Sequence, residues 1–427
     1  MELLGKKVHF IGIGGIGMSA LAQMLQHDGA LVSGSDREAS PVTELLESKG
    51  IVVCIPQKAE NVPADTNVVV YSDAVSEDNP ERARAFELGL PQFSYFKMLG
   101  EISKGKKTVA VAGTHGKTTT TGMLARVLLD AGAEPTAIIG SIVKDFGSNY
   151  VAGTSNLFVV EACEYRDHLL ELTPQVLVIN NLEWDHTDYF PSLEALQETF
   201  KKAIAKVPAD GAIVTNPSNP NIAPLLVVAR ARIVDYTKES AHELRLPGEF
   251  NQDNARAAAA AARVILPSIT DEMISSSLAA FHGTWRRFEY KGKTENGADV
   301  YDDYAHHPTA VKATLEALRA KVEGKIFVAF HPHLYSRTRD LLDEFATAFS
   351  DADKVFIAPI YAAREIDDGS ISSELLAERI RATGVDAVAL DSFEAIEHAL
   401  SVAGSGDTII TMGAGDIYKV ADALVAR

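Results

Sequence analysis

A glycine- and threonine-rich stretch, Val109–Thr121, holds the residues whose types and spacing most directly predict chemistry. The apolar run Val109–Val111 leads into a glycine turn, and a helical pattern then begins with Lys-Thr. Such a turn forms a phosphate cradle, because backbone N–H groups wrap the phosphates, Lys supplies a mobile cation and Thr can bind Mg²⁺. The spacing is tighter than in the standard motif, whose first glycine is replaced here by Val111. The predicted phosphate-binding residues are Gly113, Thr114, His115, Gly116, Lys117, Thr118 and Thr119.

A second glycine turn, Gly12–Gly17, follows the apolar run Lys7–Ile11 and precedes another helical pattern. Its G-x-G-x-x-G spacing between a strand and a helix favours diphosphate binding. The next predicted strand ends about 20 residues later at an acidic side chain, which can contact a ribose hydroxyl. Three interpretations stay open: a dinucleotide site, a site for another diphosphate such as a nucleotide sugar, or tight strand–helix packing without a ligand. The candidate residues are Gly14, Gly15, Gly17, Ser35 and Asp36.

Polar residues also follow two further apolar runs. Leu157–Val160 leads to Glu161, and Val176–Ile179 leads through two asparagines to Asp185 and His186. Ligands of open α/β sheets bind beyond the carboxyl ends of the strands, so we expect Glu161 and His186 at the same edge as the phosphate cradle. Glu161 suits Mg²⁺, which prefers oxygen ligands, whereas an ordinary loop histidine remains the alternative for His186.

The last third of the chain repeats the pattern of apolar runs that end in polar residues. Two histidine-bearing loops, Asp302–Pro308 and His331–His333, follow two such runs. Neither histidine pair has a usual zinc spacing, so anion binding is the preferred interpretation. The pair Arg286 and Arg287 is either solvated or a partner for a transferring phosphoryl group.

Bulk properties narrow the class of protein. The chain has 427 residues and a net charge of −18, which disfavours a general nucleic-acid binder. Its two cysteines, Cys54 and Cys163, form no disulfide framework and suit a reducing cytosol. The N-terminal segment reads as a strand rather than a signal peptide, and the sequence contains no run long and apolar enough for a membrane span.

Apolar runs alternating with helical patterns predict an α/β fold whose mostly parallel sheets are buried on both faces. The length allows two to four domains. A helix is expected over Ala255–Val264, with Asn251 as a possible N-cap after Pro-Gly. The predicted strands are Lys7–Ile11, Leu31–Ser35, Val68–Tyr71, Leu90–Phe93, Val109–Val111, Ala137–Ile139, Leu157–Val160, Val176–Ile179, Ala212–Thr215, Val300–Tyr301, Ile326–Phe330, Val355–Ile357 and Thr408–Thr411.

Several dispersed motifs, in order along nearly the whole chain, closely resemble those of the Mur ligases of peptidoglycan synthesis. The resemblance implies a Rossmann-like UDP-sugar domain over residues 1–106, a central P-loop ATPase domain over 107–290 and a Rossmann-like amino-acid domain over 291–427. The matching segments are Phe10–Ala22, Ala112–Thr121, Glu161–Leu170, Asn180–Phe190, Arg286–Glu289, Asp302–Thr309, His331–Thr338 and Gly413–Ile417.

The resemblance also implies a reaction, and it is closest to the members that join L-alanine to UDP-N-acetylmuramate. ATP would phosphorylate the muramoyl carboxylate, and the neutral amine of L-alanine would attack the acyl phosphate to give an amide, ADP and phosphate. Such an enzyme would use ATP and Mg²⁺, reside in the cytoplasm without a membrane span or nucleic-acid partner, and be a monomer or a homodimer.

Roles carry over from the family by position. Lys117 would hold the β- and γ-phosphates, Thr118 and Glu161 would bind Mg²⁺, and His186 would serve a second metal ion or the acyl phosphate. The Gly12–Gly17 turn, with Ser35 and Asp36, would bind the uracil nucleotide. The remaining matches are Asn251, Asn254 and Asp303 on the adenine and ribose side, Arg287 at the γ-phosphate, and His306, His307 and Arg337 at the muramoyl or amino-acid end.

The chain departs from the family pattern at two places. The span Tyr236–Leu246 is much shorter than usual, which puts the adenine-side geometry in question. Leu334 stands where many members carry a second arginine.

Three alternative functions remain open from the sequence. A related ligase that recycles murein tripeptide is the nearest, although its glycine turn is expected to differ from GIGGIGMS. An NAD(P)-dependent oxidoreductase would leave Lys117 and the Asp302–His307 segment unexplained. A non-catalytic UDP-sugar sensor would not need the phosphate cradle or Glu161.

Overall fold

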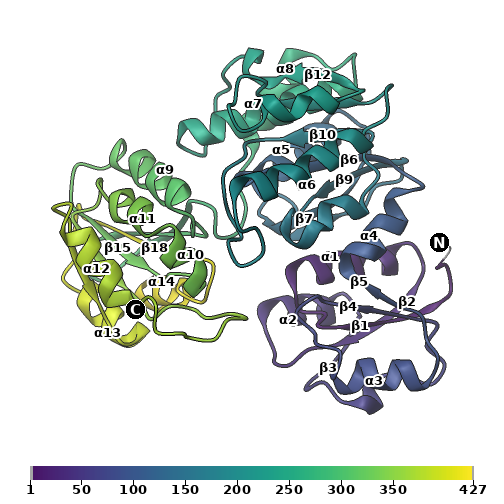
Figure 1. The fold of residues 1–427 in the computed structure, drawn as a ribbon, viewed down its shortest axis with the longest axis horizontal. Helices are drawn as coiled ribbons and strands as arrows, with labels where there is room; N and C mark the ends of the chain where they lie inside the picture. The colour runs from purple at the N-terminus through teal and green to yellow at the C-terminus, as the bar shows by residue number, and fades with distance from the viewer. Residues whose placement is uncertain (1–2, 426–427) are drawn as a thin grey trace. The chain divides into compact units, whose positions relative to one another are not determined.

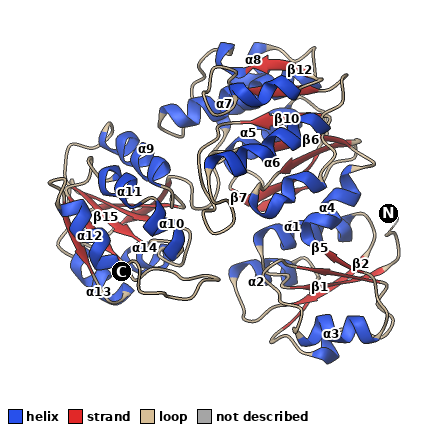
Figure 2. Cartoon of the chain, viewed as in Figure 1, coloured by secondary structure: helices blue, strands red, loops and turns tan. Residues whose placement is uncertain are grey.

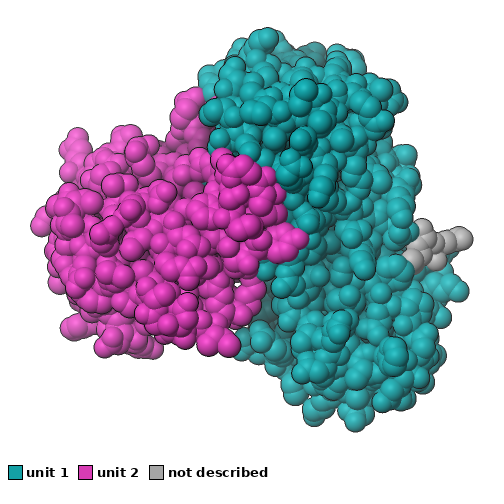
Figure 3. Space-filling view, viewed as in Figure 1, with its two compact units in different colours: residues 1–182, 197–243, 254–282 teal, residues 183–196, 244–253, 283–427 magenta. Residues whose placement is uncertain are grey.

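The computed structural model describes residues 3–425 and has three sheets, each covered by helices (Figures 1 and 2). By their contacts these residues form two compact units (Figure 3). Unit 1 comprises residues 1–182, 197–243 and 254–282, and unit 2 comprises residues 183–196, 244–253 and 283–427. The predicted α/β fold with mostly parallel sheets is confirmed, whereas the predicted boundaries at residues 106 and 290 stay a prediction.

The first sheet of unit 1 is entirely parallel, in the order β3-β2-β1-β4-β5. Strand β1 is central and almost wholly buried, as its continuous apolar sequence predicts. The strands are β1 (Lys7–Ile11), β2 (Leu31–Ser35), β3 (Val52–Cys54), β4 (Val68–Tyr71) and β5 (Gln92–Ser94), and the helices are α1 (Ile16–His27), α2 (Pro41–Ser48), α3 (Pro80–Glu87) and α4 (Tyr95–Ser103).

The second sheet of unit 1 has seven strands in the order β12-β11-β10-β6-β9-β7-β8, parallel except for the β7–β8 hairpin at one edge. Its strands are β6 (Lys107–Ala112), β7 (Thr136–Val143), β8 (Ser148–Val151), β9 (Leu157–Glu161), β10 (Val176–Ile179), β11 (Ala212–Thr215) and β12 (Arg232–Asp235). The helices of this central stretch of sequence are α5 (Lys117–Asp130), α6 (Leu193–Lys206), α7 (Glu249–Ile265) and α8 (Asp271–Ala280).

A buried polar network joins α1 to the edge hairpin of the second sheet. The Asn149 amide of β8 donates to Ile16 O at 2.6 Å and to Ser19 Oγ at 2.9 Å, while Gln23 Nε2 donates to Asn149 Oδ1 at 3.1 Å. Asn149 is 1% exposed, so these bonds replace those that water would otherwise make. The helix that follows the first glycine turn is therefore fixed to the central sheet within unit 1.

Unit 2 contains a six-stranded sheet in the order β13-β14-β18-β15-β16-β17, in which only the β13–β14 pair is antiparallel. One apolar core lies between the sheet and α9, α11 and α12, and a second lies between the opposite face and α13 and α14. The strands are β13 (Glu289–Lys293), β14 (Asp299–Asp303), β15 (Ile326–Phe330), β16 (Lys354–Ile357), β17 (Asp386–Ala389) and β18 (Thr408–Met412). The helices are α9 (Pro308–Arg319), α10 (Tyr335–Asp340), α11 (Leu342–Ala348), α12 (Ser373–Arg381), α13 (Phe393–Leu400) and α14 (Tyr418–Val425).

Local sequence signals missed some boundaries. Strand β5 begins at Gln92 rather than Leu90, and α7 begins at Glu249, six residues before the predicted start. Asn251 therefore lies inside the first turn of α7 and is not its N-cap. Its Nδ2 donates to Pro247 O at 2.7 Å, which ties the helix to the preceding Pro-Gly turn.

Candidate functional site

The phosphate loop follows β6 and ends where α5 begins, as the sequence predicts. Gly113 and Gly116 have φ of +124° and +79°, which favours glycine at both positions. A Cβ at Gly116 would lie 2.0 Å from Asn254 Oδ1, so space as well as backbone conformation requires glycine there. Thr118 and Thr119, in the first turn of α5, are buried.

Lys117 closes this loop. Its Nζ donates to Gly113 O at 2.6 Å and to Thr114 O at 3.2 Å, and it pairs with Glu164 Oε1 at 2.9 Å. Burial alone would lower the pKa of Lys117, but the nearby Glu164 carboxylate outweighs burial and raises it. The loop therefore holds a permanent cation next to the N-terminus of a helix.

Three asparagines support the loop from behind. Asn181 Oδ1 accepts from His115 N at 2.8 Å, and Asn180 Nδ2 donates to Thr120 Oγ1 at 2.9 Å. Thr120 in turn donates to Asn254 Oδ1 at 3.2 Å. Asn254, predicted to bind on the adenine side, is 5% exposed and contacts the loop itself.

Glu161 is the last residue of β9 and is half-buried. One carboxylate oxygen accepts from Gly140 N at 2.9 Å. A Cβ at Gly140 would lie 2.3 Å from the same oxygen, so the strand β7 approaches the carboxylate as closely as glycine allows. Glu161 and Thr118 offer only oxygen donors, which is the chemistry that suits Mg²⁺.

The first glycine turn is closed by an acid. Gly14 N donates to Asp36 Oδ2 at 2.7 Å, and Gly15 is the N-cap of α1 with an ordinary φ of −60°. Ser35 lies behind the turn: it is fully buried and its hydroxyl donates to Glu81. The structure thus brings together Gly14, Gly15, Gly17 and Asp36, and turns the Ser35 side chain away from them.

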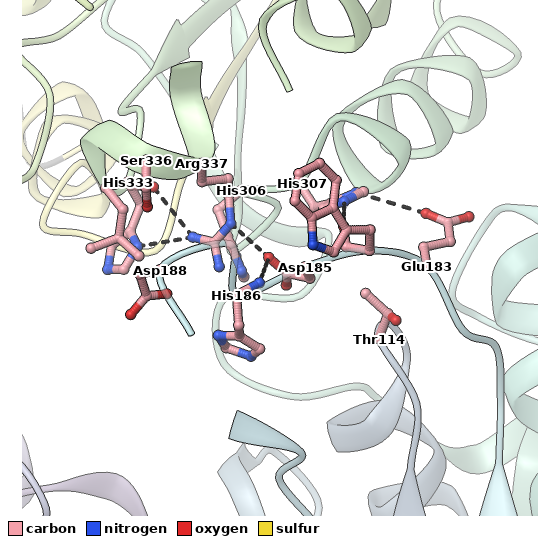
Figure 4. Close-up of polar contacts among 12 residues, drawn as sticks. Thr114, Glu183, Asp185, His186, Asp188, His306, His307, His333, Ser336 and Arg337 are labelled. Carbon is pink, nitrogen blue, oxygen red and sulfur yellow. Dashed lines mark hydrogen bonds and ion pairs between the residues drawn. The ribbon is translucent and has the colours of Figure 1, made fainter. Parts of the chain in front are cut away.

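In unit 2, a buried ion pair organises the loop that carries His186 (Figure 4). Arg337 Nε donates to Asp185 Oδ1 at 2.8 Å, and Arg337 Nη1 donates to His333 Nδ1 at 3.0 Å. Burial would raise the pKa of Asp185, yet Arg337 and the surrounding histidines hold it well below its usual range. Breaking such a pair by removing one partner typically costs about 3–5 kcal/mol. His186 follows Asp185 with φ of +52°, a conformation that non-glycine residues rarely adopt.

His306 and His307 are held in defined tautomers. His306 Nδ1 donates to Tyr304 O at 2.9 Å, and burial followed by the charge of Arg337 lowers the pKa of His306 well below its usual value. His307 is the N-cap of α9: its Nδ1 accepts from Thr309 N at 3.3 Å, and its Nε2 donates to Trp184 O at 3.1 Å. His307 therefore joins α9 to the loop that carries His186.

The two adjacent arginines differ in their surroundings. Arg286 is 4% exposed and donates to Asp302, Gly413 O and Gly415 O, so it is a structural residue. Arg287 is half-buried and lies over the ring of Tyr304 at 4.9 Å. It therefore remains the better candidate of the two for an anionic ligand.

Asp303 anchors the segment that holds Arg287. Its two carboxylate oxygens accept from Phe288 N at 2.6 Å and Ala305 N at 2.7 Å. Burial raises the pKa of Asp303 to about 6, although Arg287 and the two backbone bonds oppose that shift.

Comparisons with known proteins place the chain in a family. The model of the Mur ligase family catalytic domain matches residues 7–107, the Mur ligase middle domain matches 111–244, and the Mur ligase glutamate ligase domain matches 286–415. UDP-N-acetylmuramate–L-alanine ligase of Acetivibrio thermocellus is 43% identical over 98% of this chain and 95% of that protein. The chain belongs to the Mur ligase family. The protein of the same description in Lachnospira eligens is 41% identical over 98% of this chain and 97% of its own length.

Solved structures agree with this membership. The UDP-N-acetylmuramate–alanine ligase of Thermotoga maritima superposes on this Mur ligase with a TM-score of 0.82, at 29% identity, over 99% of this chain and 98% of that one. A murein peptide ligase from Psychrobacter arcticus gives a TM-score of 0.74 at 25% identity, over 98% of each chain. Among residues 3–425 of this Mur ligase, none of the helices combines the length and apolar character needed to span a bilayer.

Sequence reasoning did not identify two residues of this Mur ligase, Glu164 and Tyr95, and it gave no role to Asp185 and Asn180. Glu164 pairs with Lys117, Asp185 pairs with Arg337, and Asn180 supports the phosphate loop. Tyr95 packs on Gly17. Asp185 and Asn180 stood beside predicted site residues, whereas no local signal distinguishes Tyr95.

Proposed function

We propose that this Mur ligase joins L-alanine to the carboxylate of UDP-N-acetylmuramate, using ATP and an acyl-phosphate intermediate. The observation that carries the proposal is the similarity, along almost the whole chain, to ligases described by that reaction. A carboxylate is a poor acyl donor because its leaving group would be oxide. Phosphorylation replaces that leaving group with phosphate, after which the neutral amine of L-alanine can attack.

ATP would be held by the phosphate loop of unit 1. The backbone N–H groups at the start of α5 would face the phosphates, whereas the His115 N–H is already bound to Asn181 Oδ1. Lys117 would leave its carbonyl contacts to hold the β- and γ-phosphates. Thr118 and Glu161 would hold Mg²⁺, which would neutralise charge that builds up on the transferring phosphoryl group. Asn254 supports this loop, and we propose that Asn251 and Asp303 act on the adenine and ribose side.

The first glycine turn would hold the UDP sugar. We propose that Gly14, Gly15 and Gly17 form the backbone of this site: Gly15 leaves room for a ligand, whereas Gly14 and Gly17 make room for Asp36 and Tyr95 of the protein itself. Asp36 can accept from a ribose hydroxyl. The Ser35 side chain, bound to Glu81, would act only by fixing the strand end that carries Asp36.

Unit 2 would supply the remaining groups. We propose that His186 binds a second metal ion or the acyl phosphate and that Arg287 stabilises the γ-phosphoryl group. Arg337 and His307 both contact the segment that carries His186, so they would keep this histidine in place in addition to facing the muramoyl or amino-acid end with His306.

The alternatives are not favoured. The murein peptide ligase of Psychrobacter arcticus is a more distant relative than the L-alanine ligases. An oxidoreductase would need neither Lys117 nor Glu161. We also propose a cytoplasmic enzyme that works as a monomer or a homodimer.

Phosphate release tests the proposal. The purified enzyme with ATP and Mg²⁺ should release phosphate only when UDP-N-acetylmuramate and L-alanine are both present. Release that requires L-alanyl-γ-D-glutamyl-diaminopimelate in place of L-alanine would instead support the recycling reaction. Substitution of glycine or serine for L-alanine measures amino-acid selectivity.

A further inference from the structure

Tyr95 lies against the first turn of the helix that follows the sugar-binding glycine turn. It is the first residue of α4, and Ser94 caps that helix by accepting from Lys97 N at 3.4 Å. A Cβ at Gly17 would lie 2.6 Å from Tyr95 Cζ and 2.7 Å from the phenol oxygen. The third glycine of the G-x-G-x-x-G turn thus makes room for this phenol.

The helix that begins at Tyr95 also contacts the segment that follows β9. Burial, followed by the negative charge of Glu161, raises the pKa of Tyr95 far above its usual value. The next residue, Phe96, stacks on His168 with ring centroids 3.7 Å apart, and a Cβ at Gly100 would lie 2.7 Å from Glu171 O. Helix α4 therefore packs on both the glycine-turn helix and the segment after Glu161, all within unit 1.

The Tyr95 hydroxyl is available to donate a hydrogen bond to a ligand. Among residues 3–425, no hydrogen bond is made by the Tyr95 hydroxyl, and the ring is only half-buried. A tyrosine hydroxyl is protonated near neutral pH, so it can donate a hydrogen bond there. The hydroxyl lies beside the proposed sugar-nucleotide turn, on a helix that also packs against the segment after Glu161, so it is placed to meet the acyl end of the sugar nucleotide.

We propose that the Tyr95 hydroxyl donates a hydrogen bond to the lactyl carboxylate of the UDP sugar and so selects sugar nucleotides that carry this acid. This inference rests on the proposed function. A hydrogen bond from a neutral donor to a charged acceptor contributes enough free energy for about a tenfold preference.

The test compares two ligands that differ in the lactyl group. Binding of UDP-N-acetylmuramate and of UDP-N-acetylglucosamine, which lacks the carboxylate, is measured by calorimetry on the full chain and on Tyr95→Phe. We expect Tyr95→Phe to weaken UDP-N-acetylmuramate about tenfold, to leave UDP-N-acetylglucosamine within twofold, and to keep the KM for ATP and the unfolding temperature unchanged. Tyr290→Phe, at a 48% exposed tyrosine of unit 2, is the matched control and should change none of these values.

Other outcomes overturn the inference. Equal weakening of both ligands would place the hydroxyl on a group that they share, and no weakening of either would remove Tyr95 from the site. A fall in unfolding temperature with parallel loss of ATP affinity would make Tyr95 a structural residue. Failure of the unmodified protein to bind either sugar nucleotide would refute the proposed function itself, whereas binding with an unchanged preference in Tyr95→Phe refutes only this inference.

Discussion

The two glycine turns of unit 1 both link a strand to a helix, but a carboxylate binds the backbone of the first turn and an ammonium group binds that of the second. Both connect a buried strand to the N-terminus of a helix. In the first, the Asp36 carboxylate accepts from Gly14 N, and in the second the Lys117 ammonium donates to Gly113 O. Both helix N-termini attract anions through their backbone N–H groups, so the closing side chain decides which ligand each turn suits.

The two glycine motifs alone do not show which turn binds the sugar nucleotide and which binds ATP, and the opposite charges of Asp36 and Lys117 suggest an assignment. The Asp36 carboxylate on the first turn occupies the Gly14 N–H group, and it can accept a hydrogen bond from a hydroxyl donor such as a ribose. The ammonium on the second turn adds to the helix potential and favours a triphosphate. We therefore expect a change of Asp36 to affect only sugar-nucleotide binding, and a change of Lys117 to affect only the reaction of ATP.

The largest expected effect is on the second turn. Lys117→Ala removes the cation and should lower the rate of phosphate release about a thousandfold, because charge on the transferring phosphoryl group is no longer balanced. Affinity for UDP-N-acetylmuramate should stay within twofold. Lys107→Ala, at the exposed start of β6, is the control. Parallel loss of sugar binding in Lys117→Ala would show that the two turns do not work separately.

Alanine substitutions at Gly116 and Gly15, one glycine from each turn, should differ in their cost to stability. An alanine at Gly116 is strained by φ of +79° and collides with Asn254 Oδ1, so we expect Gly116→Ala to lower the free energy of unfolding by about 3 kcal/mol. Gly15→Ala meets no atom closer than 3.5 Å and should cost less than about 1 kcal/mol. Denaturant unfolding of both variants measures the difference, and equal costs would contradict the loop geometry.

Acid should lower the free energy of unfolding through a buried histidine of unit 2, His331. The backbone N–H groups of both turns do not titrate, whereas burial lowers the pKa of His331 from 6.5 to about 4. The unfolded chain binds this proton near pH 6.5 and the folded chain does not, so stability is lost as pH falls below 6.5. Between pH 7 and pH 5 this loss is about 2 kcal/mol. His331→Gln should remove about this much of the pH dependence of unfolding, whereas His306 and His333, whose pKa values burial also lowers, keep their own share. The exposed His398→Gln should leave the pH dependence unchanged.

The smallest effect is expected on the first turn. Asp36→Asn keeps an acceptor for Gly14 N but removes the charge, and should weaken UDP-N-acetylmuramate about tenfold with no change in affinity for an ATP analogue. Asp65→Asn, an exposed acid near the same sheet, serves as the control. Weakened binding of the ATP analogue in Asp36→Asn would argue against the division of tasks.

Much of this arrangement could be predicted from the sequence, because its signals are local. Glycine spacing identified both turns, and continuous apolar runs identified the central strands β1, β6 and β10. The α/β fold and the family followed from these signals and the order of the motifs. The roles given to individual residues at the site stay predictions.

The contacts that could not be predicted join segments far apart in the chain. Asp185 and Arg337 are 152 residues apart, and Asn149 meets the helix α1 across 130 residues. Position 17 must be glycine because a Cβ there would collide with Tyr95, and the glycine motif alone does not reveal this contact. Leu334 is 1% exposed with φ of +72°, and nothing in the local sequence indicates this strained position.

The most direct test of the central claim is whether the two turns bind two nucleotides at once. UDP-N-acetylmuramate is titrated by calorimetry into the full chain with and without a saturating, non-hydrolysable ATP analogue and Mg²⁺. We predict one sugar-nucleotide site in both titrations, with an affinity that the ATP analogue does not reduce. Displacement of one nucleotide by the other would show that they share a turn and would contradict the account.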